Sequence, residues 1–559
     1  MSLFGSLLGS TPKKSTGARL LERLGSAAAD VEDKREALAE FKDLSAQQAT
    51  RLIDKGGFSV LVGLLREEDT ELTRDALETL SNLMDAQVPK EDPDTAGVKA
   101  AHNSGIFLAN GTYIDAATGA AEGSEDMYVR FHCVQLLIRL LSVARDETQQ
   151  AVLSQPSTVG RLLQLLEEKR EVVRNEALLL LAQLGAANPD LQNILAFQGA
   201  NEQLLSIIEG EAKESGLGSV IVHDCLKLMR TLLGNVPSCR VFAETGCLDR
   251  LPPLLRLPPS HKKDDATTIR LTCELLWEMV SCVRTQRADL RRTQDALLRL
   301  GVVKATLELL TDAATAIDGA LRLQALCTLA ELVRGHSGSS DVLLSAKASR
   351  RQGDAVIEEG TLPRLLYIGL RSSAAAWQAT TQHLFHCLLS EGPEAQFALA
   401  ATLAPPSAAP LSPELSIGTM ALTALLGSAS GTAGPSQAAQ AWLASAVLCD
   451  LMHANTENQR LALSLAAEAS DSGGGGDGGA NGISSIDLAT PSRPSTATAV
   501  VRGDAPTAIA PAAFTPTVSP PACASPWPAA AALRPTAPAA PAAPAACDAA
   551  AAAAAAWAA

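Results

Sequence analysis

His383, His386 and Cys387 are the strongest candidates for metal ligands in this sequence. Residues three and four apart share one face of an α-helix, so a helix over 378–389 would present these side chains together. Zn²⁺ accepts imidazole nitrogen and thiolate sulfur as ligands. A structural zinc site uses four protein ligands, however, and no second ligand pair lies nearby in the sequence. We therefore expect partly buried helix residues here, and no metal site.

His223, Asp224 and Cys225 combine residue types that serve in nucleophilic catalysis. Consecutive residues of a helix point in different directions, so these three cannot form a proton relay. The sequence also lacks a GxxxxGK(S/T) phosphate loop, a GxGxxG that follows a strand, an HExxH zinc motif and a CxxC pair. We expect no catalytic residue and no cofactor, and therefore no enzyme.

The elements that hold these side chains are expected to be helices. The chain has 559 residues, of which 47% are hydrophobic but only 3% aromatic. Leu and Ala carry most of the apolar content, a balance that favours packed helices over a large β-sheet. A single hydrophobic core stops growing at about 250–300 residues, so the chain is expected to form several domains or a repeat array.

The charge balance argues against nucleic acid as a partner. Lys and Arg total 46 and Asp and Glu total 61, a net charge of −15, whereas a nucleic-acid binder needs a basic face. The 11 cysteines have no paired spacing, which is typical of a reducing compartment. No apolar stretch approaches the roughly 18 residues of a membrane span. The composition predicts a cytoplasmic protein, or one bound peripherally to a membrane.

A pair of helices recurs along the chain. Residues 57–83 align without a gap with residues 158–184. The matching apolar pairs include Leu61 with Leu162, Leu64 with Leu165, Ala76 with Ala177, Leu77 with Leu178 and Leu80 with Leu181. This spacing predicts two amphipathic helices joined by a short charged turn. One such pair cannot bury its apolar faces alone, so neighbouring pairs must stack.

Four glycines precede apolar-rich helices later in the chain. Gly199, Gly246, Gly301 and Gly360 lie about 45–60 residues apart, near the armadillo or HEAT repeat length. We expect a positive φ at each, because glycine lets the chain reverse at a helix end at little steric cost. The patterns together predict an all-α fold, an armadillo-like right-handed α-solenoid followed by a disordered Pro/Ala/Gly-rich tail.

We expect three parts along the chain: a flexible N-terminus over 1–17, the armadillo-like head over 18–468 and a disordered low-complexity tail over 469–559. The head is interrupted by residues 85–126, whose prolines, glycines and polar residues predict a surface loop with at most one weak helix near 105–117. The tail contains SGGGGDGG and is otherwise rich in Pro, Ala, Ser and Thr. This composition cannot form a packed core.

A solenoid offers a long surface on which an extended or helical partner can lie. Armadillo grooves that hold basic peptides carry a ladder of Asn, often with Trp, on successive inner helices. Asn82 lies at that place, but the matching residue of the next aligned unit is Gln183, and Trp277 and Trp377 are isolated. These departures weaken, without removing, the alternative of a cytosolic armadillo adaptor for nuclear transport or complex assembly.

One stretch of the chain resembles a known family closely. Residues 171–255 contain EVVRNEALLLLAQL, NPDLQNILAFQGANEQLLSIIEGE and VIVHDCLKLMRTLLGNVPSCRVFAETGCLDRL. Four short motifs match the pattern of the general vesicular transport factor (vesicle-docking protein) family of Golgi tethers: Val173-Arg174-Asn175, Ala196-Phe197, Val222-x-Asp224-Cys225-Leu226, and Phe242 with Glu244 and Gly246. The resemblance runs backward through DKREA at 33–37 and forward to TENQRLALSLA at 456–466, about four-fifths of the chain.

The resemblance implies a non-enzymatic vesicle-tethering factor of ER-to-Golgi and intra-Golgi transport, peripheral on Golgi and transport membranes. Its armadillo-like head, usually a homodimer, would bind a Rab-type small GTPase, SNARE fusion proteins and other Golgi tethers or golgins. No binding residue transfers directly from the family. Because the family pattern is densest over 194–255, we expect Lys227, Arg230 and Arg240 to contact a partner. The alternative is that this segment is simply well-packed core.

Beyond Glu468 the sequence departs from the family. Members continue with further repeats, a long coiled coil and an acidic tail, whereas no heptad run follows here. Because the acidic tail contacts golgins, the resemblance supports GTPase binding better than golgin binding. The sequence fits either a short isoform or a misread gene end. The segment 85–126 also departs from the family, which tends to place a more apolar helix before residues 127–141.

Overall fold

The computed structural model describes residues 16–44, 46–87, 93–256, 263–311, 319–352, 355–403, 411–427, 435–461 and 464. The chain divides into two units, and all described residues lie in the first, which comprises residues 1–466 and Ala558. The predicted flexible N-terminus and disordered tail lie outside the described residues, apart from Thr16 and Gly17, which begin the first helix. No helix in the described part of the chain is long and apolar enough to span a membrane.

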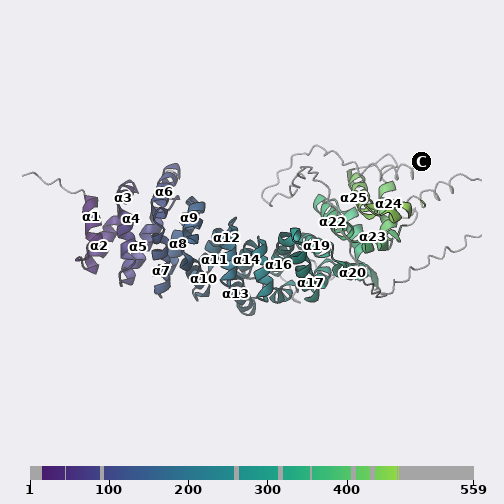
Figure 1. Ribbon diagram of the computed structural model, residues 1–559, viewed down its shortest axis with the longest axis horizontal. Helices are drawn as coiled ribbons and strands as arrows, with labels where there is room; N and C mark the ends of the chain where they lie inside the picture. Colours follow the sequence, from purple (N-terminus) through teal and green to yellow (C-terminus); the bar gives the residue numbers. More distant parts are fainter. Residues whose placement is uncertain are drawn as a thin grey trace, which may run out of the picture. The chain divides into compact units, whose positions relative to one another are not determined.

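A ladder of helices runs through the described residues, and each ladder helix packs on the next. Figure 1 shows α5, α8, α11 and α14 following one another in this way. The ladder helices are α2 (Val31–Lys42), α5 (Thr70–Leu83), α8 (Met127–Val143), α11 (Glu171–Gly185), α14 (Val220–Leu232), α16 (Lys263–Cys282), α19 (Gly319–Val333), α22 (Ala375–Leu389) and α25 (Pro435–Met452). Because neighbours cover each other's apolar faces, one hydrophobic core continues along the stack.

The remaining helices complete each repeat and close the core. They are α1 (Thr16–Gly25), α3 (Ala46–Ile53), α4 (Gly57–Leu64), α6 (Pro93–Leu108), α7 (Thr112–Gly123), α9 (Arg145–Leu153), α10 (Pro156–Gln164), α12 (Pro189–Phe197), α13 (Ala200–Glu214), α15 (Val236–Glu244), α17 (Arg287–Arg299), α18 (Val302–Thr311), α20 (Ser337–Ser345), α21 (Thr361–Arg371), α23 (Pro393–Ala400) and α24 (Ile417–Gly427). Short 3₁₀ helices are η1 (Leu165–Glu167), η2 (Cys247–Arg250), η3 (Pro252–Leu255) and η4 (Val283–Thr285). The predicted helical, armadillo-like scaffold is confirmed.

Helix α5 shows how the sequence sets these elements. Ala76, Leu77 and Leu80 are fully buried, because their spacing places them on one face of the helix. The helix begins after Asp69, whose side chain accepts a hydrogen bond from the backbone N–H of Leu72. This cap satisfies a donor that a helix start leaves unpaired. Local sequence therefore fixes both the start of α5 and the face that it buries.

Three of the four glycines named above behave as expected. Gly199, Gly246 and Gly301 have φ values of +85°, +76° and +76°, which favour glycine. The expectation is wrong at Gly360, whose φ is −62°. That glycine ends a β-strand, so the chain does not need the left-handed conformation there.

A β-hairpin departs from the otherwise helical fold. Strand β1 (Lys347–Gln352) pairs antiparallel with β2 (Ala355–Gly360), in a register that places Lys347 opposite Gly360. Strand β2 contains Val356 and Ile357, which are β-branched and favour strands. A repeat pattern based on helix spacing contains no signal for such an insertion.

The expectation of a surface loop over 85–126 is wrong for residues 93–123. Helices α6 and α7 fill this stretch, and Phe107, Ile114 and Ala117 are fully buried. The Phe107 ring packs edge-on against Phe58, with ring centroids 5.4 Å apart. Pro93 is the first residue of α6, a position that proline tolerates because its missing N–H would be unpaired there. The prolines and glycines of this stretch, together with small buried residues such as Ala117, concealed the helices in the sequence.

A buried glutamine joins neighbouring repeats. The Gln149 Nε2 of α9 donates to the backbone oxygens of Leu184 and Ala186, at 2.9 and 3.1 Å, where α11 ends. Its Oε1 accepts a hydrogen bond from Asn188 Nδ2 at 3.1 Å. Asn188 also caps the start of α12. Gln149 and Asn188 therefore provide hydrogen-bond partners for backbone carbonyls at the end of α11 and for a backbone N–H at the start of α12. They also pair their own buried polar atoms with each other.

Candidate functional site

Three exposed apolar side chains occupy matching positions at the starts of successive ladder helices. They are Tyr128 on α8, Val172 on α11 and Val220 on α14, which are 51%, 57% and 71% exposed. Leu179 lies two turns further along α11 on the same side as Val172 and is also exposed. We call these four residues the apolar row.

One hydrogen bond between ladder helices joins matching positions. Arg139 Nη1 of α8 donates to Asn82 Oδ1 of α5 at 2.9 Å, and both residues stand at the same distance from their helix starts. Gln135 Nε2 of α8 donates to Glu176 Oε2 of α11 at 3.0 Å, about one turn before the matching position of α11. The apolar row therefore lies on three ladder helices that pack on one another in turn. A run of exposed apolar side chains with polar neighbours is typical of a protein-binding surface.

The sequence did not reveal the apolar row. Val172 and Leu179 belong to the run EVVRNEALLLLAQL, in which every apolar residue is a candidate for the core. The stacking of α11 between α8 and α14 buries Val173, Ala177 and Leu181 and leaves the other two residues exposed. The start of α8 is fixed by Asp126, whose side chain accepts the backbone N–H groups of residues 128 and 129.

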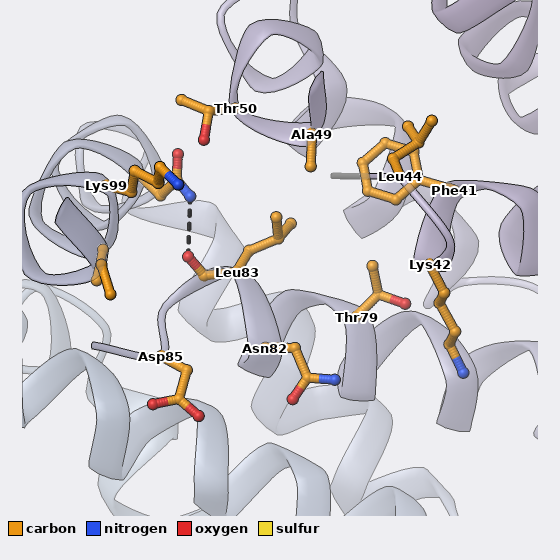
Figure 2. A pocket seen from close by; sticks show the side chains of 13 residues that line it. Phe41, Lys42, Leu44, Ala49, Thr50, Thr79, Asn82, Leu83, Asp85 and Lys99 are labelled. Atoms are coloured by element: carbon orange, nitrogen blue, oxygen red, sulfur yellow. Dashed lines mark hydrogen bonds between the residues drawn. The ribbon is translucent and has the colours of Figure 1, made fainter. Parts of the chain in front are cut away.

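A pocket of about 450 Å³ lies beside the ladder at the end of α5 (Figure 2). Phe41 and Leu83 supply apolar walls, and α6, from the segment predicted as a loop, supplies another. Asn82 lines the pocket, but its Oδ1 already accepts the bond from Arg139. The matching residues of the next two ladder helices are Arg139 and Gln183. The asparagine of α5 is therefore not repeated along these helices.

Lys227, Arg230 and Arg240, the predicted partner contacts, come from two helices. Lys227 and Arg230 lie on α14, whereas Arg240 lies on α15, which is not a ladder helix. Their side chains are 55%, 44% and 49% exposed, so none supports the core. Each is engaged in an ion pair, with Asp224, Glu274 and Asp289 respectively. Lys227 occupies the position on α14 that Leu179 occupies on α11, at the edge of the apolar row.

The helix over His383–Cys387 brings together a different set of metal-ligating groups from the one that the sequence named. His383 Nε2 lies 2.9 Å from Glu331 Oε1 of α19 and 3.6 Å from Cys387 Sγ. His386 instead pairs through Nδ1 with Asp450 at 3.2 Å. Burial alone would raise the pKa of Glu331, but hydrogen bonds from His383 and Arg334 lower it to about 2. Burial raises the pKa of the Cys387 thiol.

His223, Asp224 and Cys225 point apart, as their adjacency in one helix requires. His223 Nε2 lies 3.0 Å from Thr268 Oγ1, and Asp224 accepts a bond from Lys227. Cys225 is fully buried, and burial raises the pKa of its thiol to about 12. A thiol in this state is a poor nucleophile.

Asp295, His336 and Ser339 form a hydrogen-bond chain of residue types found in hydrolases. His336 Nε2 lies 3.0 Å from Asp295 Oδ1, and its Nδ1 lies 2.8 Å from Ser339 Oγ. The Nδ1 also accepts the backbone N–H of Ser339 and so caps α20. Ser339 is fully buried. Because the buried Ser339 hydroxyl cannot reach a substrate, the three residues do not act as a catalytic triad. Their arrangement is a helix cap.

Comparison with known proteins identifies the relatives of this chain. The Armadillo/beta-catenin-like repeat matches residues 45–85. Golgin candidate 6 of Arabidopsis thaliana is 28% identical over 401 residues, which cover 69% of this chain and 43% of that protein. General vesicular transport factor p115 of Homo sapiens is 26% identical over 398 residues, 69% of this chain and 40% of that protein. The matched region thus spans less than half the length of these relatives.

A yeast relative and a solved structure agree with these matches. Intracellular protein transport protein USO1 of Saccharomyces cerevisiae is 31% identical over 219 residues, 38% of this chain and 12% of that protein. The crystal structure of Uso1-2 superimposes with a TM-score of 0.65 at 18% identity, over 82% of this chain and 73% of that chain. That structure shares the fold of the helical stack. The homologues of this chain are therefore the p115/Uso1 vesicular transport factors and a golgin candidate, and its described residues form an armadillo-like head.

Proposed function

We propose that this chain is a non-enzymatic tethering factor of ER-to-Golgi and intra-Golgi vesicle transport. Its helical head binds a Rab-type small GTPase together with SNARE fusion proteins and other tethers, on the cytoplasmic side of Golgi and transport membranes. The names of its relatives, a general vesicular transport factor and a golgin candidate, support the transport role.

The apolar row carries the proposal of a docked protein partner. Tyr128, Val172, Leu179 and Val220 expose apolar area on three adjacent helices that are otherwise firmly packed. Exposed apolar side chains on a rigid scaffold lose little conformational entropy when a partner covers them. Aromatic and aliphatic anchors surrounded by polar side chains supply most of the binding energy in such interfaces.

Lys227, Arg230 and Arg240 remain proposed partner contacts. Lys227 and Arg230 lie on α14, the helix that also contributes Val220 to the apolar row. Charged side chains at the edge of an interface mainly raise the association rate and select the partner. Arg240 lies on α15 and is paired with Asp289, so its substitution by alanine tests a second helix of the head.

The test is retention of a Rab-type small GTPase by the immobilised full-length chain, with the GTPase loaded with a non-hydrolysable GTP analogue or with GDP. We expect retention of the GTP form only. Val220→Lys is expected to weaken binding about tenfold, as for an interface anchor. Val98→Lys is the matched control, because Val98 on α6 is also 71% exposed but lies off the ladder.

Each outcome has a separate meaning. Retention of basic localisation peptides in place of the GTPase would overturn the tethering proposal and favour an armadillo adaptor. If the GTPase binds and Val220→Lys and Val98→Lys behave alike, the tethering proposal stands and the apolar row is not its docking surface. Circular dichroism of both variants checks that the fold is unchanged.

A further inference from the structure

Helices α19 and α22 bring together three side chains that ligate metals. Glu331 lies on α19, and His383 and Cys387 lie one turn apart on α22. Their ligand atoms all lie within 4.8 Å of one another. The packing of α19 on α22 creates this cluster from residues that are far apart in the sequence.

The distance between His383 and Cys387 suits a small tetrahedral ion. Zinc bonds of about 2.0–2.3 Å place tetrahedral ligand atoms about 3.3–3.7 Å apart. The His383 Nε2 and the Cys387 Sγ are 3.6 Å apart, within that range. The Nε2 and the Glu331 Oε1 are 2.9 Å apart, a hydrogen-bond distance. An ion that replaces the proton between these two atoms needs them to separate by only a few tenths of an ångström.

Burial leaves one open side to the cluster. Glu331 and Cys387 are buried, whereas the His383 side chain is 33% exposed. An ion can therefore enter along the imidazole, and a water molecule can serve as its fourth ligand. Partly open sites of this kind, with three protein ligands, are common for zinc.

Arg334 orients the carboxylate of Glu331. Its Nε donates to Glu331 Oε2 at 2.8 Å, and its Nη2 donates to Oε1 at 3.0 Å. Such outer partners fix the direction in which a metal ligand points. Arg334 and the more distant Arg284, 3.9 Å from Oε1, also repel a dication. The site should therefore prefer an ion that gains strongly from the thiolate over Mg²⁺ or Ca²⁺, which favour oxygen.

We propose that Glu331, His383 and Cys387 bind Zn²⁺ or a similar thiophilic divalent ion. On binding, the Cys387 thiol releases its proton to solvent and forms the sulfur–metal bond. His383 ligates through Nε2, whose proton passes to Nδ1, so the thiol proton is the one that leaves when the ion binds. Glu331 ligates through Oε1 and keeps its Oε2 bond to Arg334. The sequence predicted no metal here because Glu331 is not near His383 along the chain.

Cobalt(II) added to the metal-free full-length protein tests the site. Tetrahedral Co²⁺ with a thiolate ligand gives a sulfur-to-cobalt charge-transfer band in the near ultraviolet and strong visible bands. We expect both bands at one equivalent of Co²⁺, and their loss when Zn²⁺ is added. Cys387→Ser removes the charge-transfer band. His383→Gln weakens Co²⁺ binding at least tenfold, because loss of even an outer partner of a ligand costs about 10–100-fold in metal affinity.

Two variants serve as controls. His386→Gln changes the neighbouring histidine, which pairs with Asp450, and Cys327→Ser changes a half-buried cysteine of α19. Both are expected to keep the cobalt spectrum. The proposal is overturned if the wild type shows no charge-transfer band, or if the band survives in Cys387→Ser. Circular dichroism confirms that Cys387→Ser is folded, since serine keeps the volume of the thiol closely.

Discussion

Arg174 Nη2 of α11 donates to Glu211 Oε1 of α13 at 2.9 Å, and both side chains are largely buried. The same relationship recurs in two other repeats. Lys34 Nζ of α2 lies 2.8 Å from the Oε1 of Glu67, a residue that follows α4 in the chain. Arg130 of α8 forms an ion pair with Glu168, which follows η1. In each case a cation near the start of a ladder helix binds a glutamate contributed by the following repeat. The register between repeats is therefore fixed by charge as well as by apolar packing.

Arg174→Ala is expected to destabilise the head by about 2–3 kcal/mol. Removal of one partner leaves Glu211 buried without its counter-charge, which costs about 3–5 kcal/mol for a fully buried pair. The estimate is lower here because the two side chains keep 17% and 11% exposure. The midpoint of urea unfolding, followed by far-ultraviolet circular dichroism, measures the loss.

The double variant Arg174→Met with Glu211→Leu separates pairing from packing. Apolar residues of similar volume often replace a buried ion pair without loss. We expect the double variant to recover most of the stability that Arg174→Ala loses. If it is no more stable than Arg174→Ala, the ion pair itself contributes stability that apolar packing cannot replace.

Asn201→Leu is expected to stabilise the head by about 1–2 kcal/mol. Asn201 is only 1% exposed, and neither its Oδ1 nor its Nδ2 finds a hydrogen-bond partner among the described residues. It is the second residue after a glycine with positive φ, a place that Phe58, Leu248 and Val303 fill in other repeats. An unpaired buried amide costs about 1–3 kcal/mol, which leucine avoids.

Thermal unfolding of wild type and Asn201→Leu measures this difference. A lower melting temperature for the variant would mean that ordered water satisfies the amide, because its removal would then lose real hydrogen bonds. Asn188→Leu is a suitable contrast. Asn188 caps α12 and bonds to Gln149, so the same change there should destabilise the head.

The ladder could be predicted from the sequence because its signal is local. Ala76 and Leu80 repeat at helix spacing within one unit, and the whole unit aligns without gaps with residues 158–184. Helices α6 and α7 escaped detection, since Ala117 and similar small residues bury a face without a strong apolar pattern. Whether such a small residue is buried depends on how closely a neighbouring helix packs against it, and a local sequence pattern does not contain that information.

The candidate sites depended on stacking and could not be predicted. Val172 and Val173 are adjacent and identical in type, yet only Val173 is buried, because the neighbours of α11 cover one side of it. Glu331 meets His383 only because α19 packs on α22. The sequence did name His383 and Cys387, whose spacing along one helix is a local feature. Glu331, the third residue of that cluster, lies far from both of them in the sequence.

Stability should fall in acid as Glu168 is protonated. Burial alone would raise its pKa, but hydrogen bonds from the Arg130 side chain and the Arg170 backbone hold it below its usual value of 4.5. A carboxyl whose pKa is lowered on folding adds stability above the pKa of the unfolded chain. That stability is lost as pH falls from about 4.5 through the lower folded value.

Glu168→Gln isolates this contribution. The difference in unfolding free energy between wild type and Glu168→Gln should be largest near pH 6 and shrink as pH falls below about 4.5. Urea unfolding at a series of pH values measures it. A difference that stays constant with pH would show that the ion pair with Arg130 does not favour the charged form.

Gly369→Ala should destabilise the contact between α21 and α22. A Cβ built at Gly369 would lie 2.6 Å from Thr381 Oγ1 and 2.8 Å from its Cγ2, too close for the two helices to keep their approach. Alanine gains about 1 kcal/mol over glycine in an unhindered helix, but such crowding typically costs about 1–3 kcal/mol. Gly210→Ala in α13 is the matched control, because nothing lies within 4 Å of its added Cβ. We expect a lower melting temperature for Gly369→Ala and a slightly higher one for Gly210→Ala. Equal gains in both variants would mean that α21 can move away from α22 without loss, so that this contact does not hold the repeat together.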